Sequence, residues 1–180
     1  AETKERITLF PVQCIDTMKL SRDKARQMTD PKIAEEIITG HIQTIKSLGA
    51  TCVAVGTPYD AEFLPYLTIW VNAARKAELA VWFRGNWSGW EGWFDYKKDL
   101  TPQSRLEKTI SFITSHPELF KDGDIFSPSV EPENGGPFDP VDSFEKNTLL
   151  REYLILEQLQ VKEAFRTLGK KVNTTYVSLS

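Results

Sequence analysis

Two glutamates, Glu131 and Glu133, have the residue types and spacing best suited to acid–base chemistry in this sequence. They follow a short apolar run that begins after Gly123. Side chains alternate between the two faces of a strand, so both glutamates are predicted to share a face with Ser127 and Ser129. Open α/β sheets and α/β barrels carry their chemistry at the carboxyl ends of their strands. We therefore predict a functional carboxylate here, with a pair of solvated loop glutamates as the alternative.

A loop rich in tryptophan is the second candidate feature. Trp87, Trp90 and Trp93 lie within seven positions, and Asn86 stands at the start of the loop. Exposed loops seldom carry so much aromatic surface without a use. Flat rings stack on the apolar faces of sugar rings, so the four residues are predicted to bind carbohydrate. The alternative is that the loop folds over its own aromatic rings as a small satellite core; at least one tryptophan is expected to be structural.

The ends of the other predicted strands carry further polar side chains. Asp16 ends the first strand, Tyr59 and Asp60 follow the second, Arg84 ends the third, and Tyr176 lies near the end of the fifth. If the sheet closes, these side chains converge on one mouth and line a ligand-binding floor. An arginine among carboxylates can orient a catalytic carboxylate or bind ligand hydroxyl groups. A structural ion pair between Arg84 and Asp16 is the alternative.

Strand-like and helix-like patterns alternate along the whole chain. Predicted strands begin near residues 7, 51, 79, 124 and 172. A short helix is predicted from Ser21. A longer helix is predicted to begin at Asp30-Pro31, with Asp30 as its cap, and its apolar residues recur at helical spacing over 33–48. Further helices are predicted over about 64–76, from Thr101-Pro102, and over 143–168. Regular strand–helix alternation predicts a parallel sheet with right-handed crossovers.

The α/β pattern fits either an open doubly wound sheet or a barrel. The Gly-rich phosphate loop of a dinucleotide-binding sheet does not follow the first strand. The loops after the strands are long and rich in aromatic and polar residues, as barrel loops are. We therefore predict a TIM-type (β/α)8 barrel. Residues 1–180 would form a single domain holding about its first five strands, and open barrel edges are expected to cause self-association.

Composition narrows the classes of partner and cofactor. The formal charge of −3 gives no polyanion-binding footprint. No apolar run approaches the roughly 20 residues that span a bilayer, so neither nucleic acid nor membrane is expected as a partner. Secreted and cytoplasmic locations both fit. Cys14 and Cys52 lie in apolar runs and are predicted to be buried free thiols in preference to a disulfide. Two separated histidines without a cysteine cluster predict no zinc site, and no cofactor is expected.

These features together resemble a known enzyme family. The strand–helix layout, the aromatic loop after the third strand, and Val130-Glu131-Pro132 at the end of the fourth are similar to the (β/α)8 glycoside hydrolases of clan A. Members typically end that strand in Asn-Glu-Pro, with the glutamate as general acid/base. The resemblance implies that Glu131 protonates the departing glycosidic oxygen, with Glu133 as the competing candidate. Val130 replaces the asparagine that normally contacts the sugar 2-hydroxyl.

The resemblance also implies what lies elsewhere. In this clan the nucleophile comes from the seventh strand, so the 180 residues alone are expected to be inactive. A non-catalytic carbohydrate-binding barrel using the same aromatic residues is the second hypothesis. A third is a metal-dependent sugar isomerase or aldolase in which Asp16, Glu131 and Glu133 hold a divalent cation, because carboxylates suit Mg²⁺ or Mn²⁺.

Overall fold

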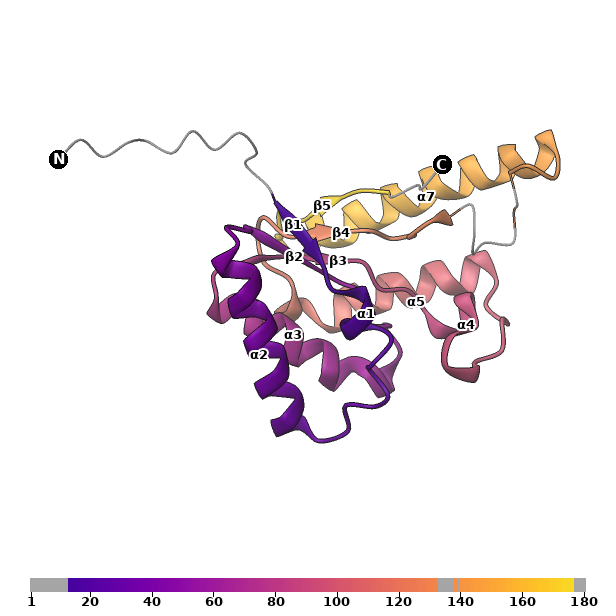
Figure 1. Ribbon diagram of the computed structural model, residues 1–180. Coiled ribbons are helices and arrows are strands. Elements are labelled where there is room, and N and C mark those ends of the chain that lie inside the picture. Colours follow the sequence, from indigo (N-terminus) through magenta and orange to yellow (C-terminus); the bar gives the residue numbers. More distant parts are fainter. Residues whose placement is uncertain (1–12, 133–137, 139, 177–180) are drawn as a thin grey trace.

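A computed structural model describes residues 13–132, 138 and 140–176. Within these residues the strands form one parallel sheet whose neighbours follow the chain order β1-β2-β3-β4-β5 (Figure 1). The strands are β1 (Cys14–Asp16), β2 (Cys52–Val55), β3 (Ala80–Phe83), β4 (Ile125–Phe126) and β5 (Asn173–Thr174). The α/β class and the parallel strand–helix alternation predicted from the sequence are confirmed.

Helices connect each strand to the next. They are α1 (Met18–Ser21), α2 (Pro31–Ser47), α3 (Leu64–Lys76), α4 (Ser88–Glu91), α5 (Pro102–Ser115) and α7 (Phe144–Thr167), with 3₁₀ turns η1 (Ala61–Phe63), η2 (Trp93–Asp95) and η3 (Pro117–Leu119). The short helix predicted to begin at Ser21 instead ends there. The predicted strand start at residues 7–12 lies outside the described residues.

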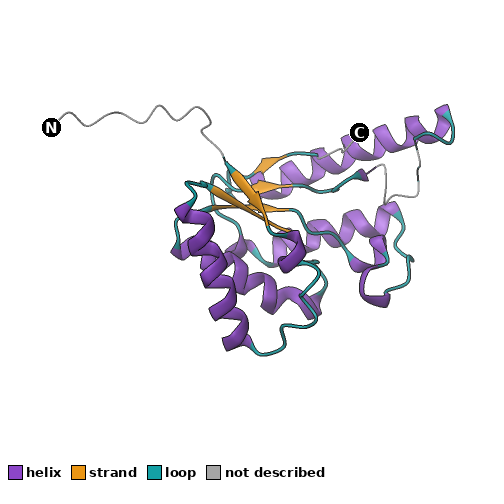
Figure 2. Ribbon diagram, viewed as in Figure 1, coloured by secondary structure: helices purple, strands orange, loops and turns teal. Residues whose placement is uncertain are grey.

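The two faces of the sheet have different surroundings. Val53, Val81 and Phe126 point to one face and are buried in the core with residues of the helices. Trp82 and Ile125, on the other face, are partly exposed. Right-handed crossovers between strands in sequential order bring successive helices to the same face. Figure 2 shows the strands in orange with the longer helices packed around them.

Local capping chemistry fixes where the long helices begin. The Asp30 side chain accepts hydrogen bonds from the first turn of α2, and Thr101 and Ser104 form a reciprocal capping box on α5. Ser143 caps α7, which is followed by Gly169 with a positive φ of 66°. The sequence predicted that these helices begin near Asp30, Thr101 and Ser143, because a helix start depends on residues only a few positions apart.

The two cysteines are joined in a disulfide, so the prediction of free thiols is wrong. Cys14 and Cys52 are register partners on the neighbouring strands β1 and β2, with Cα atoms 4.3 Å apart. Parallel pairing brings both side chains to the same face of the sheet. The two cysteines are 38 positions apart in the chain. Their proximity could not be predicted from the sequence, because the register between strands is set by the whole sheet.

A nearly buried carboxylate joins α3 to the third and fourth strands. Asp124, 1% exposed, pairs with both terminal nitrogens of Arg75. It also accepts from the backbone N–H groups of Val81 at 2.9 Å and Lys121 at 2.8 Å. A charge in this position is stable because its lone pairs are used by donors. Asp124 therefore holds the start of β4 against both α3 and β3.

Removing this carboxylate should be costly. Asp124→Ala leaves Arg75 and two backbone N–H groups without their acceptor, and we expect a loss of about 3 kcal/mol in the free energy of unfolding, measured by denaturant titration. The control is Glu35→Ala, which breaks an exposed pair with Lys76 and should cost at most about 1 kcal/mol. Equal losses for the two variants would contradict this account of Asp124.

Candidate functional site

A cavity of about 220 Å³ lies where β1, β3 and β4 lead into their exit loops. Its lining combines two arginines and two glutamates with one tryptophan and two apolar residues. The lining residues are Met18, Arg22, Arg84, Glu91, Trp93, Val130 and Glu131. Three of the residues predicted for the site, Arg84, Trp93 and Glu131, therefore meet at one cavity.

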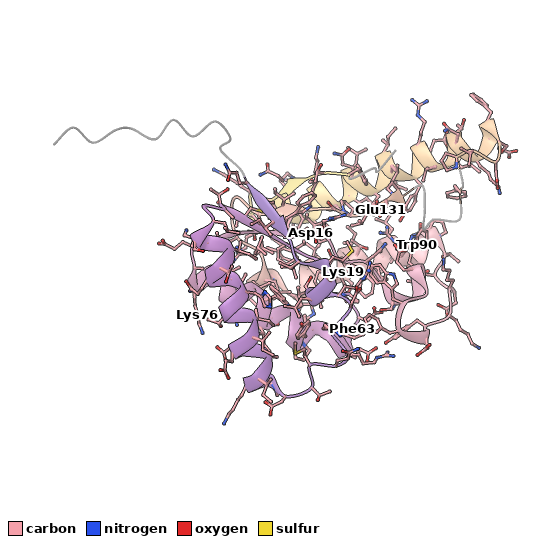
Figure 3. The ribbon with its side chains drawn as sticks, in the orientation of Figure 1. Asp16, Lys19, Phe63, Lys76, Trp90 and Glu131 are labelled. Atoms are coloured by element: carbon pink, nitrogen blue, oxygen red, sulfur yellow. A yellow bond between two sulfur atoms is a disulfide. The ribbon has the colours of Figure 1, made fainter. Side chains whose placement is uncertain are left out.

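Arg84 lines this cavity and directly follows β3. One of its terminal nitrogens pairs with Asp16 at the end of β1, and the other lies 3.8 Å from Oε1 of Glu131. The side chain is only 11% exposed and its guanidinium lies over the ring of Trp82. Figure 3 labels Asp16 and Glu131 at the same end of the sheet. The ion pair between Arg84 and Asp16, one of two alternatives from the sequence, is confirmed.

Glu131 has an uncommon backbone conformation. Its φ is 51°, in the left-handed region that side chains other than glycine rarely adopt. Such conformations cost free energy and cluster at functional sites. The side chain is 28% exposed and reaches the cavity. Glu133, the competing candidate, lies outside the described residues.

The strand predicted to lead to Glu131 is shorter than expected. β4 ends at Phe126, so strict alternation does not extend to the glutamate. Ser127 keeps the predicted face and accepts a hydrogen bond from the Trp82 indole at 2.8 Å. Ser129 instead donates to Glu157 of α7 at 2.8 Å. The prediction that Ser129 shares a face with Ser127 is therefore wrong, because the chain leaves the sheet between them.

Sequence reasoning missed Glu91, the last residue of α4, which lines the same cavity. Asn86 donates a side-chain hydrogen bond to its Oε1. Burial raises the pKa of Glu91 and nearby Glu131 adds to the rise, whereas the bond from Asn86 and the charges of Arg105 and Lys98 oppose it. The sequence signal that could have identified Glu91 is its position between Trp90 and Trp93, in the loop already predicted to bind a ligand.

Two of the three tryptophans are packing residues, which corrects the expectation of an exposed platform. Trp87 is 7% and Trp90 is 6% exposed. The Trp87 indole donates to the Thr109 hydroxyl at 3.0 Å, and the Trp90 ring stacks on Tyr153. A tryptophan side chain buries well when its N–H finds a partner. Trp93 alone of the three lines the cavity, with the Arg22 guanidinium 4.9 Å from its ring centre.

Three other predicted binding residues line a separate cavity of about 490 Å³ beside α5. These are Tyr59, Asp60 and Trp87. The Asp60 carboxylate is already used, because it accepts from the backbone N–H of Ser88 at 2.8 Å. Tyr59 is buried against Gly85, where a Cβ would lie 2.7 Å from the Tyr59 ring. Asp60 therefore helps to hold the start of α4 at this second cavity.

Asn86 and Tyr176 belong to a buried polar network instead of the cavity surface. Its centre is Arg105 of α5, which is fully buried and pairs with Glu157 of α7. Asn86 Oδ1 accepts from Arg105 Nη2 at 2.9 Å, and the Pro128 carbonyl accepts from the same nitrogen. The Tyr176 hydroxyl donates to Leu154 O at 2.7 Å, and burial raises its pKa.

Two findings on metal binding and membrane insertion concern the part of the chain that the structure describes. There, no group of three or more His, Cys, Asp or Glu side chains is arranged to hold a metal ion. Glu133, one of the three ligands of the metal hypothesis, lies outside that part. None of the described helices combines the length and apolar character needed to cross a bilayer.

Comparisons with known proteins return no match: no family model, curated protein or solved structure is similar to this chain. The geometry of the cavity must therefore carry the functional interpretation.

The raised pKa of Glu91 has a consequence for stability. A carboxyl group whose folded-state pKa lies above its unfolded value stabilises the fold fully below the unfolded pKa, and this contribution is lost as pH rises through the folded pKa. Glu91→Gln cannot ionise, so the wild type should lose stability relative to this variant as pH rises above the ordinary glutamate pKa of about 4. Thermal unfolding across this range measures the difference.

The matched control is Glu163→Gln. Glu163 is exposed on α7, and its hydrogen bond from Arg166 lowers its pKa. Because the sign of the shift is opposite, this variant should not reproduce the trend. Identical pH trends for the wild type and Glu91→Gln would contradict the assigned protonation of Glu91.

Proposed function

We propose that this chain forms the first five strand–helix units of a (β/α)8 barrel that binds carbohydrate and acts as a glycoside hydrolase. Glu131 is its general acid/base. The observation that carries the proposal is the left-handed backbone of Glu131 at a cavity shared with Arg84 and Trp93.

The strand order supports the barrel over the doubly wound alternative. A doubly wound sheet reverses its strand order at a switch point, where ligands bind. Here the order is sequential throughout β1 to β5 and every described pair is parallel. In a barrel the same order continues around until the sheet closes, and catalytic residues stand at the carboxyl ends of the strands. The position of Arg84 after β3 agrees with that arrangement.

The cavity lining supports a sugar as the ligand. Binding sites combine apolar surface with a few placed polar groups. Trp93 supplies an aromatic ring, while Arg84 and Glu131 supply charged groups that can bind hydroxyl groups. A sugar ring presents apolar C–H faces together with a rim of hydroxyl groups, so it matches both parts of this lining.

In this proposal Glu131 gives its proton to the departing glycosidic oxygen, and Arg84 positions it. A retaining glycosidase also needs a nucleophilic carboxylate about 5 Å from the acid/base. The family resemblance puts that residue on a seventh strand. Because Asp16 is held by Arg84 and by the Met18 backbone N–H at 2.8 Å, we assign it to positioning Arg84.

One observation favours a second candidate, a non-catalytic carbohydrate-binding barrel. Val130 lines the cavity at the place where the clan has an asparagine that contacts the sugar 2-hydroxyl. A valine cannot make that hydrogen bond. Hydrolysis of aryl glycosides by a protein that contains this chain and the nucleophile strand separates the two candidates.

Trp93 should report on sugar binding. We expect soluble oligosaccharides to change the tryptophan fluorescence, and Trp93→Ala to weaken their binding about fivefold or more, because stacking on an aromatic ring is worth about 1 kcal/mol. Phe144→Ala, which removes an exposed ring on α7, is the control and should leave affinity unaltered. If Trp93→Ala binds as tightly as the wild type, the cavity is not the sugar site.

The acid/base assignment is tested by rate measurements on a protein that also carries the nucleophile. Glu131→Gln should lower the rate by about 10²–10⁴, the usual contribution of general acid catalysis. Aryl glycosides with good leaving groups should suffer least, since they need less protonation. A comparable loss for Glu133→Gln, with Glu131→Gln unaffected, would transfer the role to Glu133.

A further inference from the structure

We propose that Glu91 is a second ligand-binding carboxyl group of the 220 Å³ cavity, donating a hydrogen bond to a hydroxyl of an uncharged sugar. This inference rests on the proposed carbohydrate-binding function. Beyond that function, the inference assigns a hydrogen-bonding role to Glu91 and states that the sugar carries no charge.

A chain of hydrogen bonds fixes the orientation of the Glu91 carboxyl group. Arg105 can only donate, so the Asn86 oxygen that faces it, Oδ1, is an acceptor. The Asn86 amide nitrogen must then point to Glu91, where Oε1 accepts its hydrogen bond. Among the described residues Oε1 is the only one of the two Glu91 oxygens with a hydrogen-bond partner. A proton on this carboxyl group therefore belongs on Oε2, the oxygen left for a ligand.

The surroundings of Glu91 favour that proton. Burial is the largest influence and raises the pKa of Glu91, and Glu131 acts in the same direction whenever it is ionised. Arg105 and Lys98 oppose it, as does the bond from Asn86. The cavity thus combines a carboxyl donor, Glu91, with Glu131, which lies beside the Arg84 cation.

The cations of the lining are already paired, which indicates an uncharged ligand. Arg84 contacts the carboxylates of Asp16 and Glu131. Arg22 donates through Nε to Asp23 at 2.8 Å. An acidic sugar would meet cations whose charge is already balanced by carboxylates and would add a further negative charge beside Glu131, whereas hydroxyl groups can add to the existing pairs.

Calorimetric titration of neutral gluco-, manno- and xylo-oligosaccharides from about pH 4 to pH 8 tests the proposal. Wild-type affinity should fall about tenfold as Glu91 loses its proton, the usual scale for losing a hydrogen bond to a buried group. Glu91→Gln carries an amide donor that does not titrate, so the fall with pH should disappear. Glu91→Ala should bind about fivefold or more weakly under acidic conditions. An oligouronate of equal length should bind more weakly than the neutral sugars.

The outcomes separate this inference from the proposed function. If Trp93→Ala weakens binding while both Glu91 variants bind with the wild-type pH profile, the cavity binds sugar but Glu91 is not a contact, and the inference is overturned. Tighter binding of the oligouronate would overturn the charge class. If no wild-type binding of any oligosaccharide is detected, the proposed function fails and this inference fails with it. Circular dichroism spectra establish that each variant is folded.

Discussion

The fully buried ion pair between Arg105 of α5 and Glu157 of α7 is the interaction on which the arrangement around the cavity depends. Two charges inside a protein are tolerated only when each is paired and its remaining donors and acceptors are used. The guanidinium also donates to Asn86 and to the Pro128 carbonyl, three positions before Glu131. One cation therefore holds both the residue that orients Glu91 and the segment that carries Glu131, and it joins two helices behind them.

Part of the tryptophan loop packs against this buried ion pair. Trp90 lies with its ring centre 4.9 Å from the Arg105 guanidinium and stacks on Tyr153, which also bonds to Arg105. An aromatic ring over a desolvated cation excludes water while attracting the charge. The sequence suggested that the three tryptophans bind a ligand, but Trp90 covers the protein's own Arg105 cation. Of the three rings, only that of Trp93 lines the cavity.

The sequence predicted what depends on neighbouring residues. The helices that begin after Asp30 and Ser143 were predicted because the start of a helix depends on residues within one turn. The alternation of strand-like and helix-like segments was enough to predict the parallel sheet. Arg84 and Asp16 could be paired because Asp16 ends β1 and Arg84 directly follows β3, and parallel strands end on the same side of a sheet. The partners Arg105 and Glu157 are 52 positions apart, and their pairing depends on how two helices pack. Whether a loop tryptophan is buried depends on the same packing, so residue type alone could not decide it.

The disulfide between Cys14 and Cys52 has a consequence for the edge of the site. β1 is only three residues long and is the outer strand of the described sheet, the kind of element that opens locally at low cost. The cross-link closes a covalent ring containing α1 and α2, and removes about 4 kcal/mol of loop-closure entropy from the unfolded chain in the entropic account. Asp16 is two residues from Cys14, so the disulfide also restrains the strand end that places Asp16 beside Arg84. The geometry of the cavity is thereby linked to the thiol–disulfide balance of the surroundings, and oxidising compartments preserve such bonds.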